Sequence, residues 1–235
     1  MRLSAAHWKG HLFLFERKPP PAYSASAGLR LLWIFIVLEG LIGPRLALFR
    51  LLHIPRPPFY FRVPLLLVVV LLLVRLVARV PLAQIGLYRW RKWTPTEKSY
   101  FVQIVIIANV VFLILYADRV AALFAQPVFL PRVLTSLFSY FLWGFYQEVM
   151  YRGILQTELV RRWGAVRGIL VSNTVFTFGP LHFYHFAHMS SALPMFAGIF
   201  AIGLFFGVLF WRSGNLWMVA IAHGIGNAYI EGVQA

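Results

Sequence analysis

Cysteine is absent from the chain, and charged residues are scarce. Without a thiol, the protein can form no disulfide, thiolate nucleophile or cysteine-based zinc site. Charged residues make up 12% of the 235 residues and hydrophobic residues 60%, whereas soluble domains average about 25% and about 45–50%. This composition excludes an ordinary soluble domain and indicates an integral membrane protein.

Acidic residues are the scarcer charged group, with 7 Asp and Glu against 22 Lys and Arg and a net charge of +15. In a soluble protein this excess of positive charge would suggest nucleic-acid binding. Here the arginines gather at the ends of apolar segments, where they suit anionic lipid headgroups and set the topology. We therefore expect the lipid bilayer as a partner, and no nucleic acid.

Long apolar segments make up most of the chain. At about 20 residues per span, they predict seven transmembrane helices, or eight if the N-terminal stretch forms another. The predicted spans are 29–52, 63–80, 100–124, 133–158, 165–184, 192–211 and 214–231.

We expect one all-α, polytopic membrane domain over residues 29–235, preceded by a cytoplasmic or interfacial segment at 1–28. The basic, tryptophan-rich residues 84–99 are expected at a membrane interface. Basic residues before the first span and after the second, fourth and sixth predict a cytoplasmic N-terminus.

Polar and ionisable side chains occur inside three of the apolar spans. A charged side chain in hydrocarbon costs at least ~2.5 kcal/mol on insertion scales, so such residues indicate a functional site by default. The three motifs are Gln147-Glu148-x-x-x-Arg152, Phe178-x-x-x-His182 and His223-x-x-x-Asn227.

Each motif taken singly has a structural explanation. Glu148 and Arg152 are four residues apart on one helix face, so they could form only an ion pair. His182 could be a structural hydrogen-bonding residue, and the nearby His185 and His188 could form a wet loop or bind a metal. Together, however, a carboxylate, two imidazoles and an amide are the groups that activate water and stabilise an oxyanion.

The order and spacing of the three motifs, with Gly203-Leu-Phe-Phe-Gly207 before the last, resemble the CPBP family. These are the CAAX-processing and bacteriocin-processing intramembrane endopeptidases, also called the ABI family, with motifs Glu-Glu-x-x-x-Arg, Phe-x-x-x-His and His-x-x-x-Asn/Asp. The resemblance covers about residues 84–230. It implies helices around a polar intramembrane cavity and a hydrolase that cuts peptide bonds.

The resemblance also implies roles for individual residues. It implies that a glutamate and His182 activate water, while His223 and Asn227 stabilise the oxyanion without a cofactor. Zinc is the alternative, because two histidines, a glutamate and water form a plausible ligand set. The positions that match the family motifs are Gln147, Glu148, Arg152, Phe178, His182, His223 and Asn227.

Gln147 departs from the family pattern, which has a glutamate at that position. A glutamine amide cannot accept a proton at neutral pH. Three explanations are open: an engineered replacement of a native glutamate, a natural change in which Glu148 is the base, or a catalytically inactive relative.

Counting ~1.5 Å per residue from the basic span ends puts all three motifs ~16–22 Å deep, at mid-membrane or slightly toward the outer face. The expected substrate is a membrane-anchored or prenylated protein, cut near its C-terminus. The alternatives are a non-catalytic scaffold or immunity protein of the same fold and a small proton-coupled carrier. Against a carrier, we find no inverted repeat in the sequence.

Overall fold

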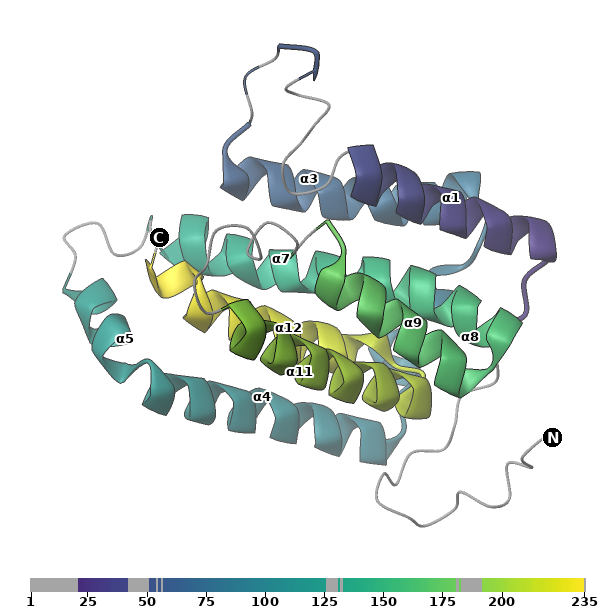
Figure 1. Cartoon of the computed structure of the whole chain (residues 1–235). Coiled ribbons are helices and arrows are strands. Elements are labelled where there is room, and N and C mark those ends of the chain that lie inside the picture. Colours follow the sequence, from purple (N-terminus) through teal and green to yellow (C-terminus); the bar gives the residue numbers. More distant parts are fainter. Residues whose placement is uncertain are drawn as a thin grey trace.

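The computed structural model of the chain describes residues 21–41, 51–53, 55, 57–125, 131, 133–180, 182 and 192–234. Every described element is a helix, which confirms the predicted all-α class. The α-helices are α1 (Ala25–Leu41), α3 (Phe59–Leu72), α4 (Pro95–Leu115), α5 (Ala117–Phe124), α7 (Phe138–Glu148), α8 (Thr157–Trp163), α9 (Ala165–Phe178), α11 (Ala192–Ser213) and α12 (Leu216–Ile230). Figure 1 shows the long helices packed side by side, with α1 and α3 on one side and α4 on the opposite side.

Shorter helical segments extend or join these helices. They are the π-helical η2 (Leu73–Val77), η5 (Val133–Leu137) and η6 (Val149–Gln156), and the 3-10 segments η3 (Leu82–Ile85), η4 (Trp90–Lys92) and η7 (Gly232–Gln234). Because η6 directly joins α7 to α8, residues 133–163 form one uninterrupted helix.

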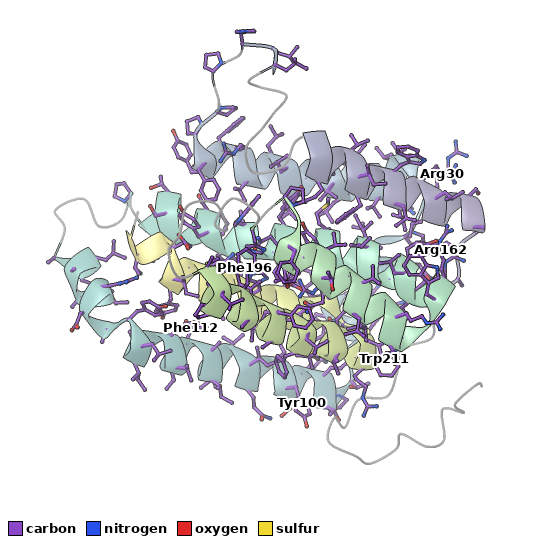
Figure 2. All side chains as sticks on the ribbon, viewed as in Figure 1. Arg30, Tyr100, Phe112, Arg162, Phe196 and Trp211 are labelled. Carbon is purple, nitrogen blue, oxygen red and sulfur yellow. The ribbon has the colours of Figure 1, made fainter. Side chains whose placement is uncertain are left out.

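Within the described parts of the chain, three helical segments are long and apolar enough to cross a membrane: Phe59–Val77, Pro95–Leu115 and Ala192–Ser213. Large apolar side chains such as Ile106 and Ile114 are exposed on the outer surface of α4, while others fill the spaces between helices (Figure 2). An apolar surface of this kind belongs in contact with lipid. The chain is an integral membrane protein, and the count of seven spans stays a prediction.

Each predicted span overlaps a described helix, but some ends differ for local reasons. The predicted span 165–184 already ends at Phe178, because Pro180 follows and cannot continue a helix. The predicted span 100–124 starts earlier, at Pro95, because a threonine–glutamate capping box precedes it.

Parts of the predicted organisation lie outside the described residues. These parts are residues 1–20, which form most of the predicted segment 1–28, residues 42–50 of the predicted span 29–52, and residues 181, 183 and 184 of the predicted span 165–184. The predicted boundary at residue 29 therefore stays a prediction, although α1 already begins at Ala25.

The connector 84–99 holds the first turn of α12, the helix that carries the last motif. The backbone N–H of Leu216 donates to the Gly86 carbonyl at 2.9 Å, and the Trp217 indole N–H donates to the Tyr88 carbonyl at 3.1 Å. Gly86 has a φ of +91°, which favours glycine at this turn. These bonds fix where α12 begins relative to the rest of the bundle.

Helices α7 and α12 come into backbone contact through two glycines. A Cβ at Gly224 would lie 2.7 Å from the Phe141 carbonyl oxygen, and one at Gly144 would lie 2.8 Å from the backbone nitrogen of Gly224. Such close approach requires small residues at the helix interface. The contact brings His223, which precedes Gly224, beside Glu148 on α7.

A buried carboxylate on α8 holds the beginning of α1 against the bundle. Glu158 accepts hydrogen bonds from the Tyr23 hydroxyl at 3.0 Å, from Arg161 Nε at 2.8 Å and from Arg162 Nε at 2.5 Å. Figure 2 shows Arg162 at this end of the molecule. Burial and then the charge of Glu158 raise the pKa of the Tyr23 phenol well above its ordinary value, so the hydroxyl stays protonated and donates.

We predict that Gly224→Ala lowers the free energy of unfolding by about 1–3 kcal/mol, because the new methyl group overpacks the α7–α12 contact. Thermal unfolding in detergent measures the effect. Gly198→Ala on α11 is the matched control, since a Cβ there meets nothing within 4 Å. Equal unfolding temperatures for the two variants would contradict the close contact.

Candidate active site

The first motif lies where α7 passes into the π-helical segment η6. Glu148 is the last residue of α7, and Arg152 lies in the middle of η6. The Thr157 hydroxyl donates to the Arg152 carbonyl at 3.0 Å and so supports the widened backbone. π-Helical turns inside α-helices are frequent at functional sites. Here the π-helical segment begins directly after the buried Glu148 and contains the buried Arg152.

One carboxylate oxygen of Glu148 contacts both a guanidinium and an imidazole. Its Oε1 accepts from Arg152 Nη1 at 3.1 Å and contacts His223 Nδ1 at 2.7 Å. The predicted ion pair is therefore present, and both of its side chains are buried. Because an ionised carboxylate can only accept, His223 Nδ1 carries the proton in this contact.

The second oxygen of Glu148 has a different environment. Glu148 Oε2 is buried and has no hydrogen-bond partner among the described residues. A buried acceptor without a partner costs about 1–3 kcal/mol. It is therefore the acceptor in the cluster with capacity for a further donor.

Arg152 is held by two further contacts across the bundle. Its Nη2 donates to the Gly203 carbonyl on α11 at 2.8 Å, and its guanidinium lies over the Phe176 ring at 4.2 Å from the centroid. One turn along, the amide of Gln156 donates to the Gly207 carbonyl at 2.8 Å. A Cβ at Gly203 would lie 3.1 Å from Arg152 Nη2, so glycine makes room for the guanidinium.

The amides of Gln147 and Asn227 form a second link between α7 and α12. Asn227 Nδ2 donates to Gln147 Oε1 at 3.1 Å. Since the amide carries two N–H donors, one remains for another acceptor. Asn227 lies one helical turn after His223, so the structure brings the first and third motifs together residue by residue.

His182 joins this cluster through Phe176. Its Nδ1 lies 2.8 Å from the Phe176 carbonyl oxygen, and its ring packs edge-on against the Phe176 ring at 5.0 Å. A carbonyl oxygen can only accept, so Nδ1 must donate, and the neutral imidazole carries its lone pair on Nε2. The Phe176 ring also contacts His223 at 5.9 Å, which places both imidazoles on one aromatic side chain.

Phe178 is not brought into the cluster. Its side chain is 46% exposed and stacks on Phe196 of α11 at 5.4 Å. The predicted span 165–184 would have put Phe178 and His182 on one continuous helix, whereas α9 ends at Phe178. Phe176, two residues earlier, contacts the site instead.

Sequence reasoning missed other buried residues around the site. The Tyr151 hydroxyl donates to Glu39 Oε1 at 2.6 Å, and the Asn173 amide donates to the Phe200 carbonyl on α11 at 2.9 Å. Glu39 could have been noticed, because it is an acidic residue within an apolar segment. Nothing in the local pattern distinguishes Tyr151 or Phe176 from ordinary core aromatics.

The predicted polar cavity stays a prediction. A cavity of about 490 Å³ lies among α4, α5, α7 and α12, and another of about 410 Å³ lies among α3, the connector, α7 and α12. Apolar side chains dominate both linings. Gln147, Glu148 and His223 line neither.

Metal binding is also untested. Within the described ranges, no three histidine, aspartate or glutamate side chains gather as a metal site would need. His185 and His188 lie outside the described residues. Glu148 Oε1 already bonds Arg152, whose positive charge opposes a cation at that oxygen. The metal-free site therefore stays a prediction.

Comparison with known protein families gives a match in the C-terminal part of the chain. Residues 129–229 match the family described as type II CAAX prenyl endopeptidase Rce1-like, which confirms the resemblance to the CPBP family. This is a family of proteases. The matched segment contains all three motifs and excludes α1, α3 and α4. No curated protein and no solved structure matches the chain.

We predict that Arg152→Ala lowers the free energy of unfolding by about 3–5 kcal/mol, because it leaves Glu148 as an unpaired buried charge. Arg152→Ala combined with Glu148→Gln should recover part of this loss, since the unpaired charge is gone. Thermal unfolding in detergent measures both. Arg167→Ala, at an exposed arginine of α9, is the control. Unchanged stability in the single Arg152 variant would contradict the buried pair.

Proposed function

We propose, from the match of residues 129–229 to the type II CAAX prenyl endopeptidase Rce1-like family, that the chain is an intramembrane endopeptidase. The observation that carries this proposal is the buried cluster in which Glu148 contacts both Arg152 and His223. Burying ionisable side chains inside an apolar bundle costs free energy. A reaction that requires these side chains explains why the protein contains them.

His182 activates the attacking water in this mechanism. Its Nε2 lone pair accepts a proton from water, and the resulting hydroxide attacks the scissile carbonyl carbon. The hydrogen bond from Nδ1 to the Phe176 carbonyl supports this role, because it fixes the tautomer. The imidazolium then returns its proton to the leaving amine when the C–N bond breaks.

His223 and Asn227 stabilise the tetrahedral oxyanion. Glu148 holds His223 through its Nδ1–H. In this mechanism His223 acts as the imidazolium, in which Nε2 also carries a proton to donate. The second N–H of the Asn227 amide supplies another donor. Each such donor to an oxyanion is worth about 10²–10³ in rate.

Gln147 keeps all three explanations open. Its amide cannot take the proton of a water molecule, but it accepts a hydrogen bond from Asn227 and so orients that residue. If a carboxylate assists His182, Glu148 Oε2 is suited, since it lacks a partner among the described residues. A replaced native glutamate or an inactive relative would instead leave this chain without turnover.

The substrate we propose is a membrane-anchored or prenylated protein, cut near its C-terminus. The family description supports a CAAX-type tail. We propose that the chain forms seven transmembrane helices around a polar cavity in a bacterial inner membrane, with a cytoplasmic N-terminus. The basic residues at the span ends support this orientation.

A non-catalytic scaffold or immunity protein of the same fold is the second candidate. Gln147 favours it, because the family glutamate is missing there. Proteolysis by the unaltered chain would eliminate it.

We expect cleavage of lipid-anchored and C-terminal-helix peptides in detergent by the unaltered chain, by its Gln147→Glu variant, or by both. His182→Ala and His223→Ala should each lower kcat/KM at least about 100-fold in the Gln147→Glu background. His53→Ala, at an exposed histidine outside the cluster, is the control. Cleavage by only the Gln147→Glu variant would make position 147 the base. Full activity in either cluster variant would contradict the site.

We also predict that chelators such as EDTA and phenanthroline leave cleavage unchanged, because the mechanism uses only side chains of the chain. Metal analysis of the purified protein should find well below one zinc per chain. Loss of activity on chelation, with recovery on adding zinc, would contradict this prediction and favour the zinc alternative.

A further inference from the structure

The cavity of about 410 Å³ beside the connector is lined by no residue of the proposed mechanism. Its volume lies in the range of about 300–1,000 Å³ that is typical of small-molecule sites. Leucine and aromatic side chains of the connector, α3, α7 and α12 make up most of its wall. Among the described residues around this cavity, Arg89 is the only charged one. The lining therefore suits an apolar chain that ends in a negatively charged group.

One end of the cavity lies at the connector. The Trp217 indole N–H donates to the Tyr88 carbonyl at 3.1 Å, and Arg89 is the next residue in the chain. From Trp217 the lining continues one helical turn along α12 to Ile221. On the side of α7, the Phe145 ring contacts Trp217 edge-on at 5.2 Å. The cavity thus runs from Arg89 into the bundle, between α3, α7 and α12.

The connector has the composition of a segment at the level of lipid headgroups. Trp90 is 50% exposed, and the neighbouring Arg91 and Lys92 are exposed too. Tryptophan and basic side chains are enriched at this level of a bilayer. No acidic residue occurs in the sequence between Glu39 and Glu97, and both of these are buried. This end of the cavity is therefore positively charged, which favours an anionic headgroup over a zwitterionic one.

Arg89 is placed to bind the phosphate of such a headgroup. Its side chain is exposed, and it takes part in none of the ion pairs among the described residues, which are those of Glu148 and Glu158. A guanidinium presents five N–H donors in a planar fork that matches two oxygens of a phosphate. Because Arg89 also lines the cavity, an acyl chain attached to that phosphate can enter the apolar space beside it.

We propose that this cavity binds one anionic phospholipid, with its phosphate on Arg89 and one acyl chain between α3, α7 and α12. The lipid contacts the connector, which holds the first turn of α12, and the two helices that carry Glu148 and His223. It thereby stabilises the arrangement of these helices. Lipid binding needs no turnover, so it is tested independently of the proposed function.

Native mass spectrometry of the delipidated protein in detergent measures the binding, with phosphatidylglycerol and phosphatidylcholine of identical acyl chains as probes. We expect one retained phosphatidylglycerol per chain and at least about fivefold weaker binding of phosphatidylcholine. Arg89→Gln should weaken phosphatidylglycerol binding by about the same factor, which is the contribution of one cation. Arg167→Gln is the matched control, because Arg167 is exposed, is predicted on the same side of the membrane and lines neither cavity. Equal affinity for the two lipids, or equal losses in the two variants, would overturn the proposal.

A second pair of variants tests the position of the acyl chain. Leu71→Trp fills the cavity from α3 and should lower phosphatidylglycerol binding at least about tenfold, because a packed interior has no room for the chain. Leu72→Trp is the matched control, since the adjacent Leu72 is 50% exposed and lines neither cavity. Unchanged binding in Leu71→Trp would overturn the proposal. If Leu71→Trp does not fold, the comparison of Arg89→Gln with Arg167→Gln still decides.

Thermal unfolding in detergent gives a further readout. Phosphatidylglycerol should raise the unfolding temperature of the unaltered chain more than that of Arg89→Gln, because a ligand of the folded state stabilises it. An equal rise in both would overturn the proposal.

A farnesylated peptide tests whether the cavity instead takes the anchor of a substrate. We expect the peptide to leave the retained phosphatidylglycerol in place. Displacement of the lipid by the peptide would assign the cavity to the substrate and would overturn the proposal. If no peptide is cleaved at all, the proposed function fails, and the lipid measurements still decide the role of the cavity.

Discussion

A guanidinium can stay buried between apolar helices only if its charge and its N–H donors have partners. The arrangement of the whole site depends on the partners of the Arg152 guanidinium. The side chain pairs with Glu148 on its own helix, donates to the Gly203 carbonyl on α11 and lies over the Phe176 ring on α9. Three helices are therefore tied to one charge. Because Glu148 is held in this way, it can in turn orient His223.

Glycine residues allow the neighbouring helices to pack close to the Arg152 guanidinium and to one another. Gly203 leaves room for the guanidinium on α11, and the pair Gly144 and Gly224 brings α12 into backbone contact with α7. A bilayer gives little hydrophobic drive for helix association, so close packing and interhelical hydrogen bonds must supply it. The polar contacts of the site thus also contribute to the stability of the bundle.

Much of the fold could be predicted from hydropathy, because apolar length and helix-ending residues are local properties of the sequence. The Glu148–Arg152 pair could likewise be predicted from spacing alone. Phe178 was assigned from the family motif, whereas α9 ends at that residue and Phe176 is the aromatic residue that packs against His182. Glu39 could have been noticed as an acidic residue in an apolar segment, but its contact with Tyr151 could not, because the two residues are 112 positions apart and no local pattern reports such a contact.

The π-helical segment Val149–Gln156 changes how the sequence should be compared with others. A π turn contains more residues than an α turn, so each inserted residue rotates the remainder of the helix by about 100° around the axis. Deleting one residue here would leave no gap in the helix but would turn the buried carboxylate of α8 away from α1. A single-residue gap in an alignment at this place therefore denotes a change of helical register and not a loop.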